Sequence, residues 1–175
     1  AEAKAAEERA AAEKAAKEAQ EKEDIEKAPA TALQRAVEYT KEQELDVGEL
    51  AKGHLSDELT NEQKVALAEY NMERMHNDDE YRKEIEGKCG KILEENRDDL
   101  LESVPDDGPV GKAVRENLSN LTAEKFADAV ISSGVAEYGK KLVEITSNNE
   151  INRPEVDRLK KEMVEKAAAE KEAAA

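Results

Sequence analysis

One stretch near the C-terminus decides the fold: residues 154–175, PEVDRLKKEMVEKAAAEKEAAA. Pro154 suits the first turn of a helix, because its ring fixes φ near the helical value and its missing N–H is not needed there. Val156, Leu159 and Met163 then recur at helical spacing and give this helix an apolar face to bury. After Val164 only Ala, Glu and Lys follow, which predicts that the helix leaves a folded body and continues into water as a polar rod.

Residues 1–28 have the same composition and predict a second polar helix, about 42 Å long at 1.5 Å per residue. Pairs of Glu and Lys spaced by four residues, each contributing roughly 0.2–0.5 kcal/mol, support it: Glu13–Lys17, Glu18–Lys22 and Glu23–Lys27. Its alanines form a poor coiled-coil seam, because Glu8 and Lys22 interrupt them. Two alternatives stay open: an independent semi-rigid rod, or an antiparallel pair with the C-terminal helix.

Between the polar helices, residues 29–153 predict one compact, all-α, multi-helix domain of ordinary size. Only 3% of the chain is aromatic, so aliphatic side chains must build most of the core. About eight helices are expected in the chain, and no segment predicts a strand with a partner.

Capping residues, prolines and glycines set the expected helix limits within this domain. Pro29 ends the first polar helix, and the capping boxes Thr31-x-x-Gln34 and Thr60-x-x-Gln63 begin two others. Asp46 caps a short helical turn, and Asn77-Asp78-Asp79 separates two longer helices.

Thr122 begins a helix that Gly134 closes. Residues 103–109 form a loop, and Gly87 and Gly90 predict a close helix crossing or a kink.

The net charge of −16 narrows the classes of partner. Residues 1–28 carry −3 and residues 155–175 carry −1, so the residues between them carry −12. Such a surface repels nucleic-acid phosphates and anionic membranes, and no run of about 18 apolar residues predicts membrane insertion. A partner protein with a basic surface is attracted. The alternative interpretation is that the charge only keeps an elongated protein in solution.

No group of residues predicts catalysis, so we expect a non-enzymatic protein without catalytic, cofactor-binding or metal-binding residues. His54 and His76 are 22 residues apart, which is not a zinc-ligand spacing. Cys89 shares a helix face with apolar residues and is interpreted as a buried structural thiol. Residues 108–112 lack the spacing of a phosphate-binding loop. Asn117 and Asn120 begin N-glycosylation sequons that matter only on a secretory route.

The Ala/Glu/Lys/Gln stretch at residues 1–24 resembles the long helical spacers of colicin-type bacteriocins and of TolA-like envelope proteins. In bacteriocins such helices carry a receptor-binding module, so the resemblance implies a receptor-binding or translocation segment. The composition and helical pattern by themselves predict a protein–protein interaction module presented on long helices, with contacts expected at residues 46–59 and 103–109.

A self-assembling scaffold or internal virion protein is the other alternative, with oligomerisation through the terminal helices. With Cys89 as its single cysteine, the chain leaves the cellular compartment open.

Overall fold

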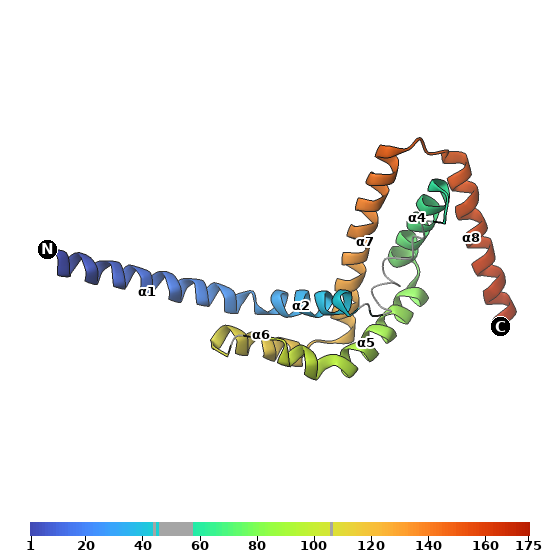
Figure 1. Cartoon of the computed structure of the whole chain (residues 1–175). Coiled ribbons are helices and arrows are strands. Elements are labelled where there is room, and N and C mark those ends of the chain that lie inside the picture. Colours follow the sequence, from blue (N-terminus) through green and yellow to red (C-terminus); the bar gives the residue numbers. More distant parts are fainter. Residues whose placement is uncertain (44, 46–57, 106) are drawn as a thin grey trace.

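The computed structural model describes residues 1–43, 45, 58–105 and 107–175, and in this part of the chain all regular structure is α-helical (Figure 1). The helices are α1 (Glu2–Glu26), α2 (Ala28–Glu42), α4 (Asn61–Asn77), α5 (Asp79–Glu102), α6 (Pro109–Ser119), α7 (Ala123–Asn148) and α8 (Arg153–Ala174). The all-α prediction is therefore confirmed. The expected helical turn at Asp46 lies outside the described residues.

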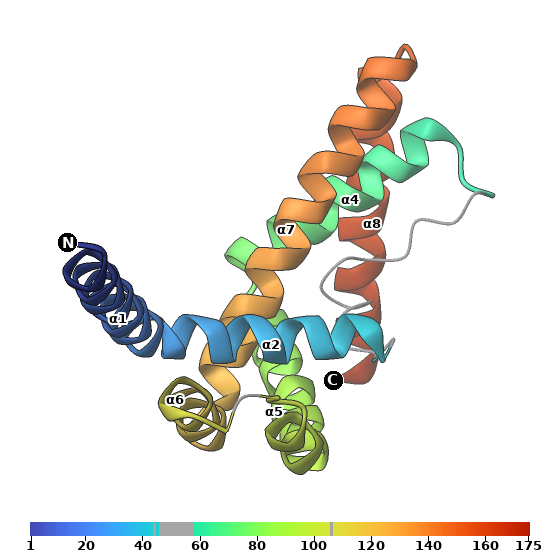
Figure 2. The same cartoon turned by 60° about the vertical axis from the view of Figure 1, so that its left-hand side comes forward.

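The main core lies where α2, α4 and α5 pack on the long helix α7, and α6 adds to it through its contacts with α2 and α5. Figure 2 shows α2 crossing α7, with α5 and α6 below them. The largest fully buried side chains of this core are Met75, Ile85, Leu93, Leu118, Phe126 and Tyr138. Aliphatic residues with a few aromatic rings thus build the core, as the composition requires.

A second, smaller core joins α8 to α4. Val65 and Ala66 of α4 and Val156 of α8 are buried, and Leu159 and Met163 pack against them. These residues belong to a cluster separate from the main core. The apolar stripe of the C-terminal segment is therefore what attaches α8 to the body.

Side-chain caps define four of the helix starts. Thr60 and Gln63 form the reciprocal capping box at the start of α4 that the sequence predicts. Asp78, Thr122 and Asn152 each accept a hydrogen bond from a backbone N–H in the first turn of α5, α7 and α8, respectively. Such caps satisfy N–H groups that have no partner within the helix.

The predicted start of α2 is wrong. This helix begins at Ala28, three residues before Thr31, and has no side-chain cap at its N-terminus. Pro29 lies in its first turn, where the missing N–H costs nothing, and the N–H of Thr31 already donates to the Lys27 carbonyl oxygen (2.9 Å). Pro29 therefore lies in the first turn of α2 and does not end α1, whose last residue is Glu26.

The predicted break at Gly134 is also wrong, because α7 continues through it to Asn148. Gly134 is buried in the helix, between the buried residues Ile131 and Tyr138. A mid-helix glycine costs about 1 kcal/mol relative to alanine. The packing of α7 against three other helices offsets that cost.

Gly90 marks a close crossing of α5 and α7. A Cβ atom built there would lie 3.1 Å from the Cβ of Ala123, whereas one at Gly87 would meet nothing within 4 Å. The prediction of a close crossing therefore holds at Gly90, which is where the N-terminal end of α7 passes.

The two polar helices leave the body at different places (Figure 1). No residue of α1 is buried, and every residue from Val164 to Ala175 is exposed. In the described part of the chain α1 touches only α2 and α6, whereas α8 packs on α4. Of the two alternatives for the terminal helices, the antiparallel pair is thus not formed within one chain.

Candidate functional site

The residues weighed for chemistry in the sequence do not gather into one site. His76 is exposed at the end of α4, and His54 lies outside the described residues. Among the described residues, no three His, Cys, Asp or Glu side chains come close enough to hold a metal ion. No described helix is long and apolar enough to cross a membrane.

Cys89 is fully buried in α5. Burial, with a smaller contribution from the charge of Glu86, raises the pKa of its thiol to about 12. The protonated thiol is a poor nucleophile, so this environment suits a structural cysteine.

The loop at residues 103–109, expected to make contacts, is partly built into the body. Val104 is buried, and the Arg35 side chain donates to the carbonyl oxygen of Ser103 (3.0 Å). Asp107 is fully exposed. Of the other expected contact segment, residues 46–59, only residues 58 and 59 are described, so most of it lies outside the described residues.

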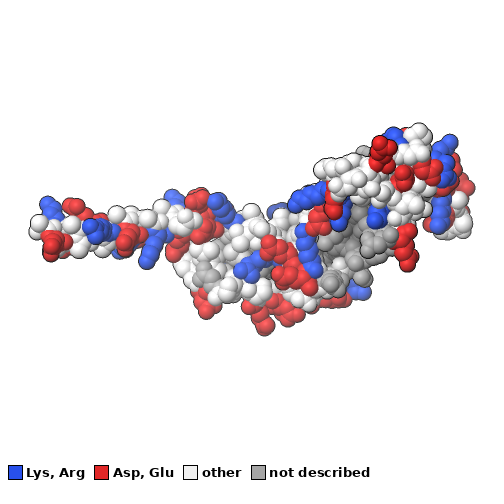
Figure 3. Space-filling view, turned by 45° about the horizontal axis from the view of Figure 1, so that its top comes forward, with Lys and Arg blue, Asp and Glu red and all other residues white. Residues whose placement is uncertain are grey.

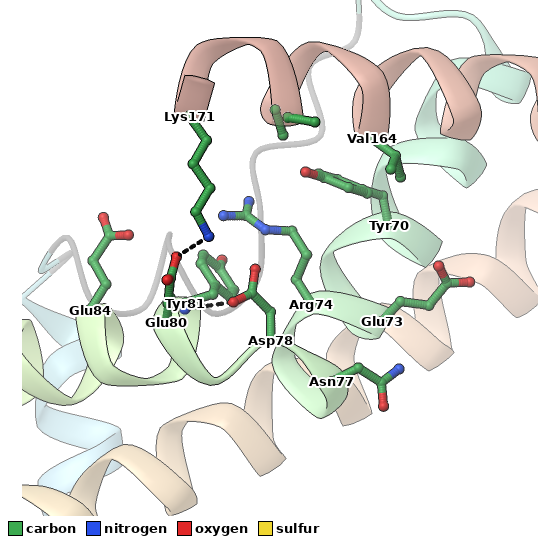
Figure 4. Close-up of a pocket in the computed structure, with 12 residues that line it drawn as sticks. Tyr70, Glu73, Arg74, Asn77, Asp78, Glu80, Tyr81, Glu84, Val164 and Lys171 are labelled. Carbon is green, nitrogen blue, oxygen red and sulfur yellow. Dashed lines mark hydrogen bonds and ion pairs between the residues drawn. The ribbon is translucent and has the colours of Figure 1, made fainter. Parts of the chain in front are cut away.

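The structure adds a site that the sequence analysis missed. The chain bends at Asp78, between α4 and α5, and the C-terminal part of α8 continues past this bend. Between them lies an open groove with a volume of about 590 Å³, which we call the elbow groove (Figure 4). Its lining residues are Tyr70, Glu73, Arg74, Asn77, Asp78, Glu80, Tyr81, Glu84, Val164, Ala167, Ala168 and Lys171.

Two aromatic rings and one guanidinium group lie together in the elbow groove. The guanidinium carbon of Arg74 is 3.7 Å from the ring centroid of Tyr81 and 5.2 Å from that of Tyr70. Tyr81 is buried and Tyr70 is half-buried, and Figure 4 shows Arg74 between the α4–α5 bend and α8. A cation over an aromatic face is attracted by the ring quadrupole, so the three side chains hold one another in place.

The opposite wall of the groove is apolar and exposed to solvent. It belongs to α8 and consists of Val164, Ala167 and Ala168, all exposed. Val164 is 54% exposed, and among the described residues only Ile25 and Val143 are other large apolar side chains that are exposed. Lys171, with its Nζ 2.7 Å from an Oε of Glu80, forms the ion pair that ties this part of α8 to α5.

Acidic side chains surround the groove. Asp78 and three exposed glutamates, Glu73, Glu80 and Glu84, line it, against the two cations Arg74 and Lys171. Figure 3 shows acidic and basic groups alternating along the rod of α1, while acidic groups gather in patches on the body. The groove therefore has a negative rim around an aromatic and apolar interior.

Next to the groove, ion pairs between basic residues of α8 and glutamates of α4 help to attach α8. Arg153 pairs with Glu69 at 2.6 Å, and Lys160 pairs with Glu73 at 2.5 Å. Burial raises the pKa of Glu69, but the hydrogen bond from Arg153 and the charges of Lys160 and Arg153 outweigh it and hold that pKa below its usual value. Glu69 is thus ionised whenever α8 is in place near neutral pH.

A pattern in the sequence points to this groove. Tyr70 and Arg74 are four residues apart and so share a face of α4. The buried residues Val65, Ala68 and Met75 lie on another face of the same helix, so their apolar spacing does not point to the groove. Tyr81 comes close to Arg74 only because the chain bends at Asp78, and no local sequence pattern specifies the angle of that bend.

Comparison with protein-family models, curated proteins and solved structures finds no match to this chain. The proposal for its function therefore depends on the groove itself.

Proposed function

We propose that this chain is a non-enzymatic protein–protein interaction module that binds a partner protein through the elbow groove. The observation that supports this proposal is the stack of Tyr70, Arg74 and Tyr81 beside the exposed Val164. Tyrosine and arginine are enriched among the few residues that dominate binding energy at interfaces. In a chain with only five aromatic residues, two of them line this one groove.

Another hollow, between α2 and α7, is a weaker candidate. Its volume is about 560 Å³, and it is lined by small, aliphatic and polar residues, Glu38 and Lys41 among them, with no aromatic ring. It offers no side chain of the types that anchor interfaces. The elbow groove combines an anchor, an apolar wall and a charged rim, which is the usual anatomy of an interface.

The charge of the groove supports a partner with a basic surface. Four carboxylates and two cations line it, and the body as a whole is strongly acidic. Opposite charge on the partner speeds association and helps to exclude other surfaces. Nucleic acid is disfavoured for the same reason.

The test is affinity capture with the full chain as bait, from cytosol and from solubilised envelope, read by quantitative mass spectrometry. Glu84→Lys reverses one charge of the rim, and Glu116→Lys makes the same change on an exposed position of α6. We expect one saturable partner that is retained by Glu116→Lys and reduced severalfold by Glu84→Lys. Equal capture of the partner by both variants would show that the partner does not bind at the elbow groove.

A second candidate function is the receptor-binding or translocation segment of a colicin-like bacteriocin. The observation that favours it is α1, a 25-residue helix without a buried residue that extends from the folded body (Figure 1). A rod of this kind would hold the body away from the rest of a longer protein. A partner found only in the envelope fraction would favour this candidate. Recovery of the bait alone would favour the self-assembling scaffold instead.

A further inference from the structure

We propose that the occupant of the elbow groove is an amphipathic helix of the partner protein, with small or aliphatic residues on one face and Lys or Arg beside them. This inference rests on the proposed function and names the partner's class. Three features of the groove support it: its helical walls, its continuity with the α4–α8 interface, and its charge.

The walls of the groove favour a helix over an extended segment. Both walls are helices, whose backbone N–H and C=O groups are already paired within α4, α5 and α8. An extended peptide would leave its own backbone groups without partners there, whereas a helix satisfies them internally. Ala167 and Ala168 keep the α8 wall low, so the backbone of another helix can approach closely.

The groove continues an interface that already holds a helix of the predicted kind. Along α4, the aliphatic residues of α8 pack on Val65 and Ala66, while Arg153 and Lys160 pair with Glu69 and Glu73. The part of α8 before Val164 is itself an amphipathic helix with basic residues facing the glutamates of α4. From Val164 on, glutamates of α4 and α5 and apolar residues of α8 again lie together, and no helix of the described residues covers them.

The remaining charge of the groove defines which helix fits. Lys171 already pairs with Glu80, and Arg74 stacks on two rings. Within the described ranges, the ion pair of Glu84 is a distant one, at 3.7 Å from Lys88 of its own helix, and more than half of its side chain is exposed. A Lys or Arg on the incoming helix would pair with Glu84 while its apolar face covers Val164 and Tyr70.

The experiment titrates the ¹⁵N-labelled full chain with three synthetic 18-residue peptides and follows the backbone amides by NMR. The first contains Leu, Ala and Lys, with apolar residues at i, i+3, i+4 and i+7. The second replaces three of its Ala by Pro, which keeps the charge but prevents a helix. The third replaces every Lys by Glu. We expect the first peptide alone to saturate shifts at Tyr70, Arg74 and Val164, at least about 10-fold more tightly than the others.

Two charge reversals and one truncation locate the binding. Glu84→Lys removes a charge of the rim and should lower the affinity for the first peptide about 10-fold. Tyr70→Ala removes an aromatic anchor and should lower that affinity by at least as much. Glu116→Lys on α6 should leave it unchanged. If the proline peptide binds the groove as tightly as the helical one, the helical partner is wrong and the proposed function stands. If neither Lys-containing peptide shifts the amide signals of the groove residues, and capture of the partner does not depend on Glu84, then the helical partner and the proposed function are both wrong.

Discussion

Gly87 and Gly90 lie three residues apart on α5, yet their surroundings differ. A side chain at Gly90 meets Ala123, whereas one at Gly87 meets open space. The sequence could predict that one of them lies at a crossing, because glycine is costly within a helix. It could not say which, since that depends on where the start of α7 passes over α5.

This difference predicts opposite effects for the same substitution. Gly87→Leu should raise the free energy of unfolding by about 0.5–1 kcal/mol, through better helix propensity. Gly90→Leu should lower it by about 1–3 kcal/mol, because the larger side chain forces α5 and α7 apart. Urea unfolding followed by circular dichroism measures both. Equal changes in the two variants would contradict the close crossing.

The buried thiol of Cys89 gives a second prediction at this scale. Since burial raises its pKa to about 12, the thiol stays protonated and shielded in the native chain. A thiol reagent at pH 8 should therefore label Cys89 at least about 100-fold more slowly in the native chain than in urea. Labelling at the same rate in both would show that the thiol is exposed.

At the scale of helices, caps and apolar stripes were predictable, whereas contacts between helices were not. The Thr60 capping box and the helix start near Pro154 depend on local chemistry, and the structure contains the capping box and has Pro154 in the first turn of α8, which begins at Arg153. The local preferences of Gly134 and Thr31 predict helix ends that the structure does not have, because the packing of α7 and the first turn at Pro29 outweigh them. The groove depends on how three helices meet, so the sequence could not reveal it.

The attachment of α8 through its small core can be tested on two valines of the same helix. Val156 is fully buried and Val164 is 54% exposed. Val156→Ala should cost about 1–3 kcal/mol of unfolding free energy, since it removes buried apolar contacts. Val164→Ala should change it by less than about 0.5 kcal/mol. Thermal unfolding and limited proteolysis of α8 measure the difference, and similar costs for both valines would contradict this attachment.

The ion pairs of α8 predict a dependence on pH. The pKa of Glu69 is lower in the folded chain than its usual 4.5, so its contribution to stability is present above about pH 4.5. As pH falls through the lowered pKa, Glu69 becomes protonated and the contribution is lost. Proteolysis of α8 should therefore accelerate in acid. Glu69→Gln, which has no charge to lose, should show a smaller acceleration; an equal one would assign the effect to other carboxylates.

At the scale of the whole molecule, the chain is a helical body with α1 and α8 directed to different sides (Figures 1 and 2). The polar composition of both ends predicted their exposure but not their separation. That separation follows from packing, because α8 is attached to α4 and α1 touches α6.

A disulfide designed between the terminal helices tests this separation. In the Cys89→Ala background, Ala12→Cys with Ala168→Cys should not form an intramolecular bond, because α1 and α8 make no contact. Non-reducing electrophoresis after mild oxidation at low protein concentration measures it. A monomer that becomes cross-linked would show that the two helices pair.

The central claim is that the elbow groove is where this chain contacts its partner. Site-specific photo-crosslinking tests it most directly, with a benzophenone amino acid in place of Ala168, on the α8 wall, or of Ala11, on α1. The account predicts a saturable adduct with one protein from Ala168, weakened by Glu84→Lys, and none from Ala11. The same adduct from Ala11, with none from Ala168, would contradict it.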